Sequence, residues 1–150
     1  MEPEKISKFE KYANLYNKDA FNTLNEEMSF EEYVEKLYQR PRLCRNSFQY
    51  ILDMILAPGT EEFERYRTTY VKYKFFSEDK ISPIFGLEET LDALVNFIHG
   101  AAGGFGTEKR VCLLHGPVGS SKSTICRIIK RGLESYSKTD DGAWYTYRWV

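Results

Sequence analysis

The sequence predicts an α/β protein in which an α-helical N-terminal region precedes a strand, a glycine-containing turn and a further helix. Apolar residues recur at helical spacing through much of residues 1–56. A short continuous apolar run, Val111 to His115, has the composition of a strand covered on both faces. Apolar residues at helical spacing then return from Ser123 to Ser137. This order of elements favours an α/β fold over an all-helical one.

The composition is that of a protein able to bury a core. The chain has 150 residues, of which 42% are hydrophobic, and a formal net charge of −1. This charge gives no overall field to attract nucleic acid or an anionic membrane, so neither is expected as a partner. The charged N-terminal segment lacks the apolar stretch of a signal peptide, and no run approaches the ~18 apolar residues of a membrane helix. We therefore expect a soluble, cytoplasmic protein.

The cysteines point to a reducing compartment. Cys44, Cys112 and Cys126 are odd in number and have no metal-ligand spacing. We expect them to be free thiols that serve as small packing residues.

Residues 1–56 are expected to form a helical N-terminal region. Its first helix carries Ile6, Phe9, Ala13 and Tyr16 on one face. Ser29 and Glu32 have the spacing of a capping box and begin a second helix, which Pro41 ends. A third helix places Cys44, Phe48, Ile51, Leu52 and Ile55 on one face and stops at the turn-forming residues 57–60.

Residues 57–83 are expected to be a linker arm. They are charged and aromatic, and the alternation around Tyr70, Val71, Tyr73 and Phe75 leaves a short strand open as an alternative. Interleaved basic and aromatic residues can also stack on single-stranded nucleic acid. An arm whose aromatic residues pack on the protein is favoured, because nothing else in the sequence supports a nucleic-acid channel.

Residues 84–150 contain the elements that carry chemistry. Leu87, Leu91, Leu94, Val95 and Ile98 form one apolar stripe on a predicted helix. A loop rich in small residues connects this helix to the run at 111–115, and Ile125, Ile128, Ile129 and Leu133 are expected to face inward on the helix from Ser123 to Ser137. Residues 142–150 have the composition of another strand.

The turn between the predicted strand and helix matches the phosphate-loop pattern G-x-x-x-x-G-K-[ST], also called Walker A, at every position but one. Backbone N–H groups of such a turn, together with the helix dipole, attract phosphate. Lys122 can reach the β- and γ-phosphates, Ser123 can offer its hydroxyl to Mg²⁺, and Thr124 can bond the α-phosphate. The cradle itself would consist of Gly116, Pro117, Val118, Gly119, Ser120 and Ser121.

Ser121 is the departure, since the pattern has a glycine there. If the loop requires positive φ at this position, serine costs roughly 1–2 kcal/mol. If the loop requires ordinary helical dihedral angles, the cost is small and the hydroxyl could donate to phosphate. The sequence leaves these two alternatives open.

The segment that precedes the loop resembles part of the adenine pocket of AAA+ ATPases. In those proteins an apolar pair and a glycine open a helix before the phosphate loop, and Ile84, Phe85 and Gly86 stand at the matching positions. The order and spacing fit AAA+ proteins better than GTPases. The resemblance implies a P-loop NTPase (AAA+-like) core that binds ATP with Mg²⁺.

A more specific resemblance covers the chain from about Ser29 to its end. The stretches SFEEYVEKLYQRPRLCRNSFQYILDMI, YKFF, IFGLEETLDALVNFI and LLHGPVGSSKS are similar to the N-terminal AAA region of the PrkA-type serine protein kinases. Where that family usually has GPVGGGKS, this chain has Ser120 and Ser121. The resemblance implies ATP binding, a ring-shaped homo-oligomer, a protein substrate and phosphoryl transfer to serine.

The predicted core is incomplete. Hydrolysis of ATP needs an acidic residue at the end of a second core strand. Asp140 and Asp141, the two aspartates after Ser123, lie in a predicted turn. Residues 84–150 are therefore interpreted as the N-terminal part of an AAA+ domain, in a fragment or truncated product without hydrolytic activity of its own. Two alternatives stay open: part of an AAA+ remodelling motor, and a non-catalytic nucleotide-binding module for oligomerisation.

Overall fold

A computed structural model describes residues 25–65 and 67–149. These residues divide into two compact units, one ending at Gln39 and the other beginning at Arg40. The first unit contains α3 (Phe30–Gln39), and the predicted capping box is present at its start. The backbone N–H of Ser29 donates to Glu32 at 2.7 Å, and the N–H of Glu32 donates to the Ser29 hydroxyl at 3.2 Å. The helix expected around Ile6 lies outside the described residues.

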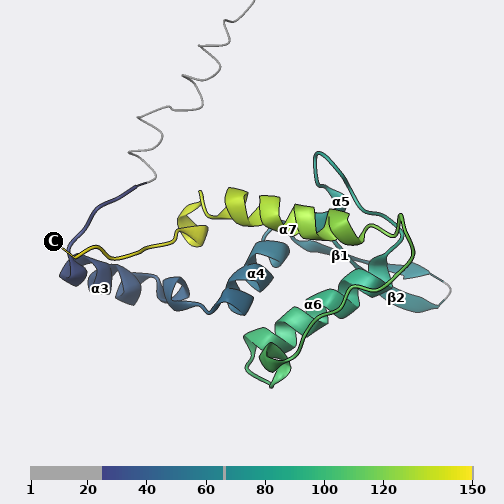
Figure 1. Ribbon diagram of the computed structural model, residues 1–150, viewed down its shortest axis with the longest axis horizontal. Coiled ribbons are helices and arrows are strands. Elements are labelled where there is room, and N and C mark those ends of the chain that lie inside the picture. Colours follow the sequence, from purple (N-terminus) through teal and green to yellow (C-terminus); the bar gives the residue numbers. More distant parts are fainter. Residues whose placement is uncertain (1–24, 66, 150) are drawn as a thin grey trace, which may run out of the picture. The chain divides into compact units, whose positions relative to one another are not determined.

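The second unit contains the remaining helices (Figure 1). The principal ones are α4 (Ser47–Leu56), α6 (Glu88–Ala102) and α7 (Lys122–Tyr136), and each confirms a helix predicted from apolar spacing. A capping box of Asn46 and Gln49 begins α4. Shorter helical segments are η1 (Pro41–Cys44), α5 (Lys74–Ser77), η2 (Thr107–Lys109) and η3 (Asp140–Gly142).

The segment expected to be a linker arm contains a β-hairpin. Strands β1 (Thr60–Arg65) and β2 (Thr68–Tyr73) pair antiparallel, with Phe63 opposite Tyr70. These two rings stack with centroids 5.7 Å apart. The strand left open as an alternative is therefore present, and it has a partner. The hairpin leads into α5, so this part of the chain contributes to the core.

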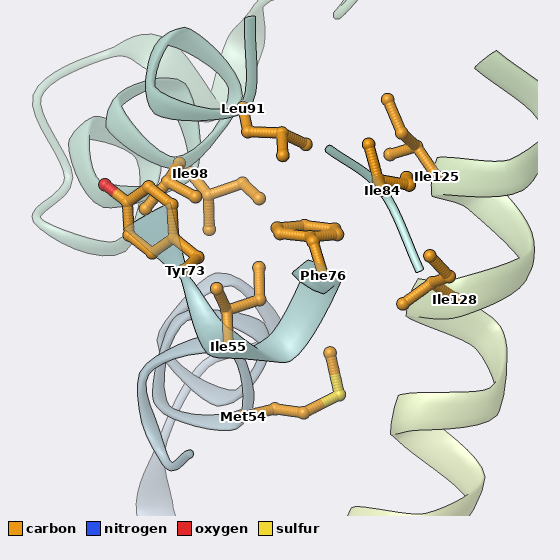
Figure 2. Packing of buried hydrophobic residues seen from close by; sticks show 10 residues of the cluster. Met54, Ile55, Tyr73, Phe76, Ile84, Leu91, Ile98, Ile125 and Ile128 are labelled. Atoms are coloured by element: carbon orange, nitrogen blue, oxygen red, sulfur yellow. The ribbon is translucent and has the colours of Figure 1, made fainter. Parts of the chain in front are cut away.

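The core of this unit surrounds Phe76, which is fully buried (Figure 2). Residues Met54 and Ile55 approach it from α4, and Leu91 approaches it from α6. Burial of such a ring contributes about 1.5–3 kcal/mol to stability. The buried residues of the cluster are Met54, Ile55, Tyr73, Phe76, Ile84, Leu91, Val95, Ile98, Ile125 and Ile128.

Arg45 links α4 to the C-terminal end of α7. Its guanidinium donates to the carboxylate of Asp53 on α4, to the hydroxyl of Tyr136 on α7 and to the backbone carbonyl of Asp141. The same group lies 5.2 Å from the centroid of the Tyr50 ring, in cation–π geometry. One buried cation therefore fixes the far end of the helix that the predicted phosphate loop opens.

Two predicted strands are wrong. Residues 111–115 and 143–149 have no regular secondary structure, and within the described residues neither belongs to a sheet; the hairpin is the sheet that is present. A strand needs a neighbour to take its backbone N–H and C=O groups, and composition alone does not supply one. Accordingly Val111 is 92% exposed and Leu113 is 81% exposed, although both were expected to be covered.

Two further observations concern the surface. The three cysteines are free, as expected, but each is exposed, so their assignment as packing residues is wrong. Within residues 25–65 and 67–149, no helix is both long and apolar enough to span a membrane.

Candidate functional site

The predicted phosphate loop joins the segment at 111–115 to the first turn of α7. The backbone turns at Gly119, where φ is 87°, and again at Ser121, where φ is 58° and ψ is 11°. Ser121 therefore occupies the left-handed region, which decides between the two alternatives that the sequence left open. A residue with a Cβ atom is strained there by about 1–2 kcal/mol.

The side chain of Lys122 folds back over the loop that precedes it. Its ammonium group donates to the carbonyl oxygen of Gly116 at 2.7 Å, to the carbonyl oxygen of Pro117 and to the hydroxyl of Ser120 at 2.8 Å. The Ser120 hydroxyl in turn donates to the Pro117 carbonyl at 2.8 Å. The positive charge therefore lies over the carbonyl groups of the turn, where an anion entering the loop would meet it.

Gly116 faces this cluster at close range. A Cβ atom built on Gly116 would lie 2.8 Å from the hydroxyl oxygen of Ser120 and 3.9 Å from Nζ of Lys122. Real Cβ atoms do not approach an oxygen so closely, so the absence of a side chain at Gly116 allows the loop to close.

The first backbone N–H groups of α7 have no acceptor within the helix. The helix begins its own hydrogen bonding with the N–H of Ile125, which donates to the carbonyl of Ser121 at 2.9 Å, and the Ser121 side chain does not cap the helix. The N–H groups of Lys122, Ser123 and Thr124 therefore point out of the helix end, where the dipole favours anions. The side chain of Ser123 is exposed and that of Thr124 is partly buried.

The segment Ile84 to Gly86 contacts the same helix through its first residue. Ile84 is buried and faces Ile125 and Ile128 of α7 (Figure 2). Its N–H donates to the carbonyl of Phe76 at 2.9 Å. Phe85 is 67% exposed, and Gly86 has a positive φ of 75° with its N–H bonded to the Glu88 carboxylate at 3.1 Å. The predicted adenine segment therefore begins in the core and continues at the surface.

The acidic residues that follow the loop lie far from it. Asp140 and Asp141 belong to η3, beyond the C-terminal end of the 15-residue helix α7. At 1.5 Å per residue this helix separates them from Lys122 by about 20 Å. No three His, Cys, Asp or Glu side chains within the described residues gather as a metal site.

The turn at residues 116–121 leads into a helix and brings a lysine and a serine hydroxyl together, and comparison with known proteins identifies the class. The family model described as the PrkA AAA domain matches residues 28–146. The chain belongs to this family.

Two relatives extend the comparison. The chain is 35% identical over 144 residues to the ATP-dependent protease PrkA of Bacillus subtilis (strain 168), and the match covers 95% of this chain but 21% of that protein. It is also 31% identical over 107 residues to a Geobacillus stearothermophilus protein described as an uncharacterized protein in the gldA 5′ region, covering 71% of this chain and 97% of that one. The chain thus spans about a fifth of the Bacillus subtilis relative's length. No solved structure matches.

Two residues near the site were missed from sequence. Asp79 and Arg131 form an ion pair with an N–O distance of 2.8 Å, between the turn that precedes Ile84 and helix α7. The sequence carries local patterns only: Asp79 opens a turn that ends in a serine and a proline, and Arg131 follows Ile125 and Ile128 at three-residue intervals. Neither pattern indicates that these two residues pair.

Proposed function

We propose that this chain is an ATP-binding AAA+ segment of a PrkA-like protein and that it binds Mg·ATP through residues Gly116 to Thr124. The observation that carries the proposal is the position of the Lys122 ammonium over the carbonyl oxygens of Gly116 and Pro117. A phosphate oxygen that enters the loop can take the place of a carbonyl as the lysine's acceptor, and the exchange from a neutral to a charged acceptor strengthens the hydrogen bond.

The remaining residues of the loop have separable roles in this proposal. The backbone of Gly116 to Ser121 forms the cradle, and the N–H groups at the start of α7 bind phosphate oxygens. Ser123 has an exposed hydroxyl, which fits one position of a Mg²⁺ ion that otherwise keeps water and phosphate oxygens as ligands. Thr124 contacts the α-phosphate. Bound Mg²⁺ would neutralise charge on the phosphates.

Base recognition is assigned to residues Ile84, Phe85 and Gly86. Ile84 is anchored on α7, while Phe85 and Gly86 lie at the surface where a base could contact them. We propose adenine as that base, because the segment has the order and spacing of the corresponding AAA+ segment. In this proposal residues 84–150 are the N-terminal part of a nucleotide-binding domain, and α4 and β2 before them contribute to the same core.

The activity of a whole protein that contains this segment is a further proposal. The resemblance to PrkA-type serine protein kinases implies phosphoryl transfer to a protein serine within a ring-shaped oligomer. The relative in Bacillus subtilis bears the name of an ATP-dependent protease, which favours the alternative of an ATP-driven machine that acts on protein. Both proposals share the nucleotide site and a protein substrate. A non-catalytic role, in which nucleotide orders an oligomer, is the third.

Calorimetric titration of the chain with Mg·ATP tests the binding proposal. Lys122→Ala removes a charge-assisted contact, which should cost ~1.5–3 kcal/mol and weaken binding roughly 10- to 100-fold. Lys130→Ala is the matched control, because Lys130 is an exposed lysine on the same helix. Saturable binding that Lys122→Ala alone weakens supports the proposal. A folded, monodisperse chain that binds neither Mg·ATP nor Mg·ADP refutes it.

A further inference from the structure

Asp79 closes the turn that leads into Ile84. One carboxylate oxygen of Asp79 accepts from the N–H of Ser82 at 2.7 Å, from the N–H of Ile81 at 3.1 Å and from the guanidinium of Arg131 at 2.8 Å. The Asp79 side chain is 14% exposed. A single oxygen therefore fixes the shape of the turn and also connects it to α7.

Arg131 differs from its basic neighbours on α7. Arg127 and Lys130 are exposed, whereas the side chain of Arg131 is 32% exposed and turned toward Asp79. Its Nε atom is buried and has no hydrogen-bond partner among the described residues. An unpaired buried donor lowers the contribution of such an ion pair to stability. What the pair does provide is a fixed distance between the turn and the helix.

A second contact holds the same segment a few residues later. Ile84 packs against Ile125 and Ile128 (Figure 2). Arg131 follows these two residues along α7 at three-residue intervals. Six residues of helix span about 9 Å. Residues 79–84 are therefore attached to α7 at two points, one polar and one apolar. Phe85 and Gly86 follow directly after the second of these contacts, which Ile84 makes.

We propose that Asp79 and Arg131 are positioning residues that hold the base-contacting segment 84–86 at a fixed place relative to the phosphate loop. The inference rests on the proposed function, in which the base contacts segment 84–86 and the phosphates contact the loop at the start of α7. Neither residue contacts the nucleotide. The pair acts through Ile84 on the base and leaves Lys122 and the cradle unchanged.

This division of roles predicts that the two parts of ATP respond differently. Mg·ATP uses both the base segment and the loop, whereas Mg·tripolyphosphate uses the loop alone. Loss of the ion pair lets the base segment move, so the affinity for Mg·ATP falls and the affinity for Mg·tripolyphosphate does not change. A residue that merely supports the fold would weaken both ligands together.

The experiment measures both affinities by calorimetry for the chain and for Asp79→Asn, Arg131→Gln and Lys130→Gln. Asp79→Asn keeps an oxygen acceptor for the Ile81 and Ser82 N–H groups and removes the charge that pairs with Arg131. For Asp79→Asn and Arg131→Gln we expect the Mg·ATP affinity to fall about 5- to 20-fold, with the tripolyphosphate affinity within about twofold of the original. Lys130→Gln removes an exposed charge next to Arg131 and should change the affinities for both ligands by the same factor. Arg131→Lys should recover part of the Mg·ATP affinity.

The outcomes separate this inference from the function on which it rests. If the original chain binds neither Mg·ATP nor tripolyphosphate, the proposed function fails. If it binds both and the two variants weaken both equally, or weaken neither, the positioning role alone is overturned. Circular dichroism of each variant shows whether it is folded, and should Arg131→Gln unfold, Asp79→Asn and Arg131→Lys carry the same test.

Discussion

The Nζ atom of Lys122 lies 2.7 Å from the carbonyl oxygen of Gly116, so the lysine reaches back to the first residue of its own loop. Ser120 lies between them, accepting from Lys122 and donating to Pro117. The ammonium group is therefore held in place before any phosphate arrives. In the proposed function, a phosphate oxygen replaces one of these acceptors while the long side chain keeps its place, which limits the entropy that binding costs.

Gly116→Ala should weaken nucleotide binding and leave the fold intact. The new Cβ atom would stand 2.8 Å from the Ser120 hydroxyl, which must rotate away and lose its bonds to Lys122 and Pro117. We expect roughly 3- to 10-fold weaker Mg·ATP binding, which corresponds to about one hydrogen bond. Calorimetry gives the affinity, and because the φ of 159° at Gly116 is unfavourable for alanine, the midpoint of thermal unfolding should also fall.

The double variant Gly116→Ala with Ser120→Ala is the control for this explanation. Removal of the hydroxyl leaves the Ser120 Cβ atom at 3.6 Å, an ordinary contact distance. The double variant should therefore bind more tightly than Gly116→Ala alone. Equal or weaker binding would show that the collision with Ser120 is not the cause.

Ser121→Gly should stabilise the chain. Relief of the left-handed strain at Ser121 is worth about 1–2 kcal/mol, and the added freedom of glycine in the unfolded chain offsets about 0.4–1 kcal/mol of it. The expected net gain in the free energy of unfolding is about 0.5–1 kcal/mol, measured by urea denaturation. Ser120→Gly is the matched control, because the φ of Ser120 is not positive. It should destabilise the chain, and a gain of the same size in both variants would contradict the strain argument.

The sequence predicted the helices well because their signals are local. The capping box of Ser29 and Glu32 and the apolar stripes of α4, α6 and α7 involve residues within a few positions of one another. The phosphate loop could be proposed for the same reason, since its pattern is contiguous. At Ser121, however, two alternatives stayed open, because the dihedral angles of one residue depend on how the whole turn closes.

The rest depended on contacts that the sequence does not display. The run at Val111 has the composition of a strand, but composition is no evidence of a partner, and within the described residues it has none. The residues expected as an arm pair with each other as a hairpin and deliver Phe76 to the core. Arg131 reads as one more surface cation until Asp79, 52 positions earlier, is placed beside it.

Tyr73 should make stability depend on pH in the alkaline range. Burial of the Tyr73 side chain raises the pKa of Tyr73 to about 12, and the nearby Asp92 carboxylate adds to this shift. The Tyr73 hydroxyl donates a hydrogen bond to that carboxylate at 2.8 Å. The ordinary pKa of tyrosine is about 10. Because the pKa is raised in the folded state, the contribution of the protonated Tyr73 hydroxyl to the free energy of unfolding is complete below about pH 10. This contribution is lost as pH rises toward 12. The contribution is on the order of 1–3 kcal/mol.

Tyr73→Phe isolates this contribution from other groups that titrate at high pH. Urea denaturation of the chain and of Tyr73→Phe at several pH values gives the difference in the free energy of unfolding. That difference should be constant from pH 7 to about 9.5 and should shrink between about pH 10 and 12. A difference that stays constant to pH 12 would mean that Tyr73 does not titrate with a raised pKa.

The exposed apolar run before the loop should promote self-association of this chain. Leu113 is 81% exposed in a segment without regular secondary structure, whose backbone groups join no ladder within the described residues. Such a segment is a template for pairing with another chain. Leu113→Thr should reduce association, measured by light scattering against concentration, and should change the free energy of unfolding by less than about 0.5 kcal/mol. The neighbouring residue Leu114 packs against the core cluster, so Leu114→Thr should instead destabilise the chain by about 1–3 kcal/mol. If Leu113→Thr associates as strongly as the original chain, the run is not the surface through which copies meet.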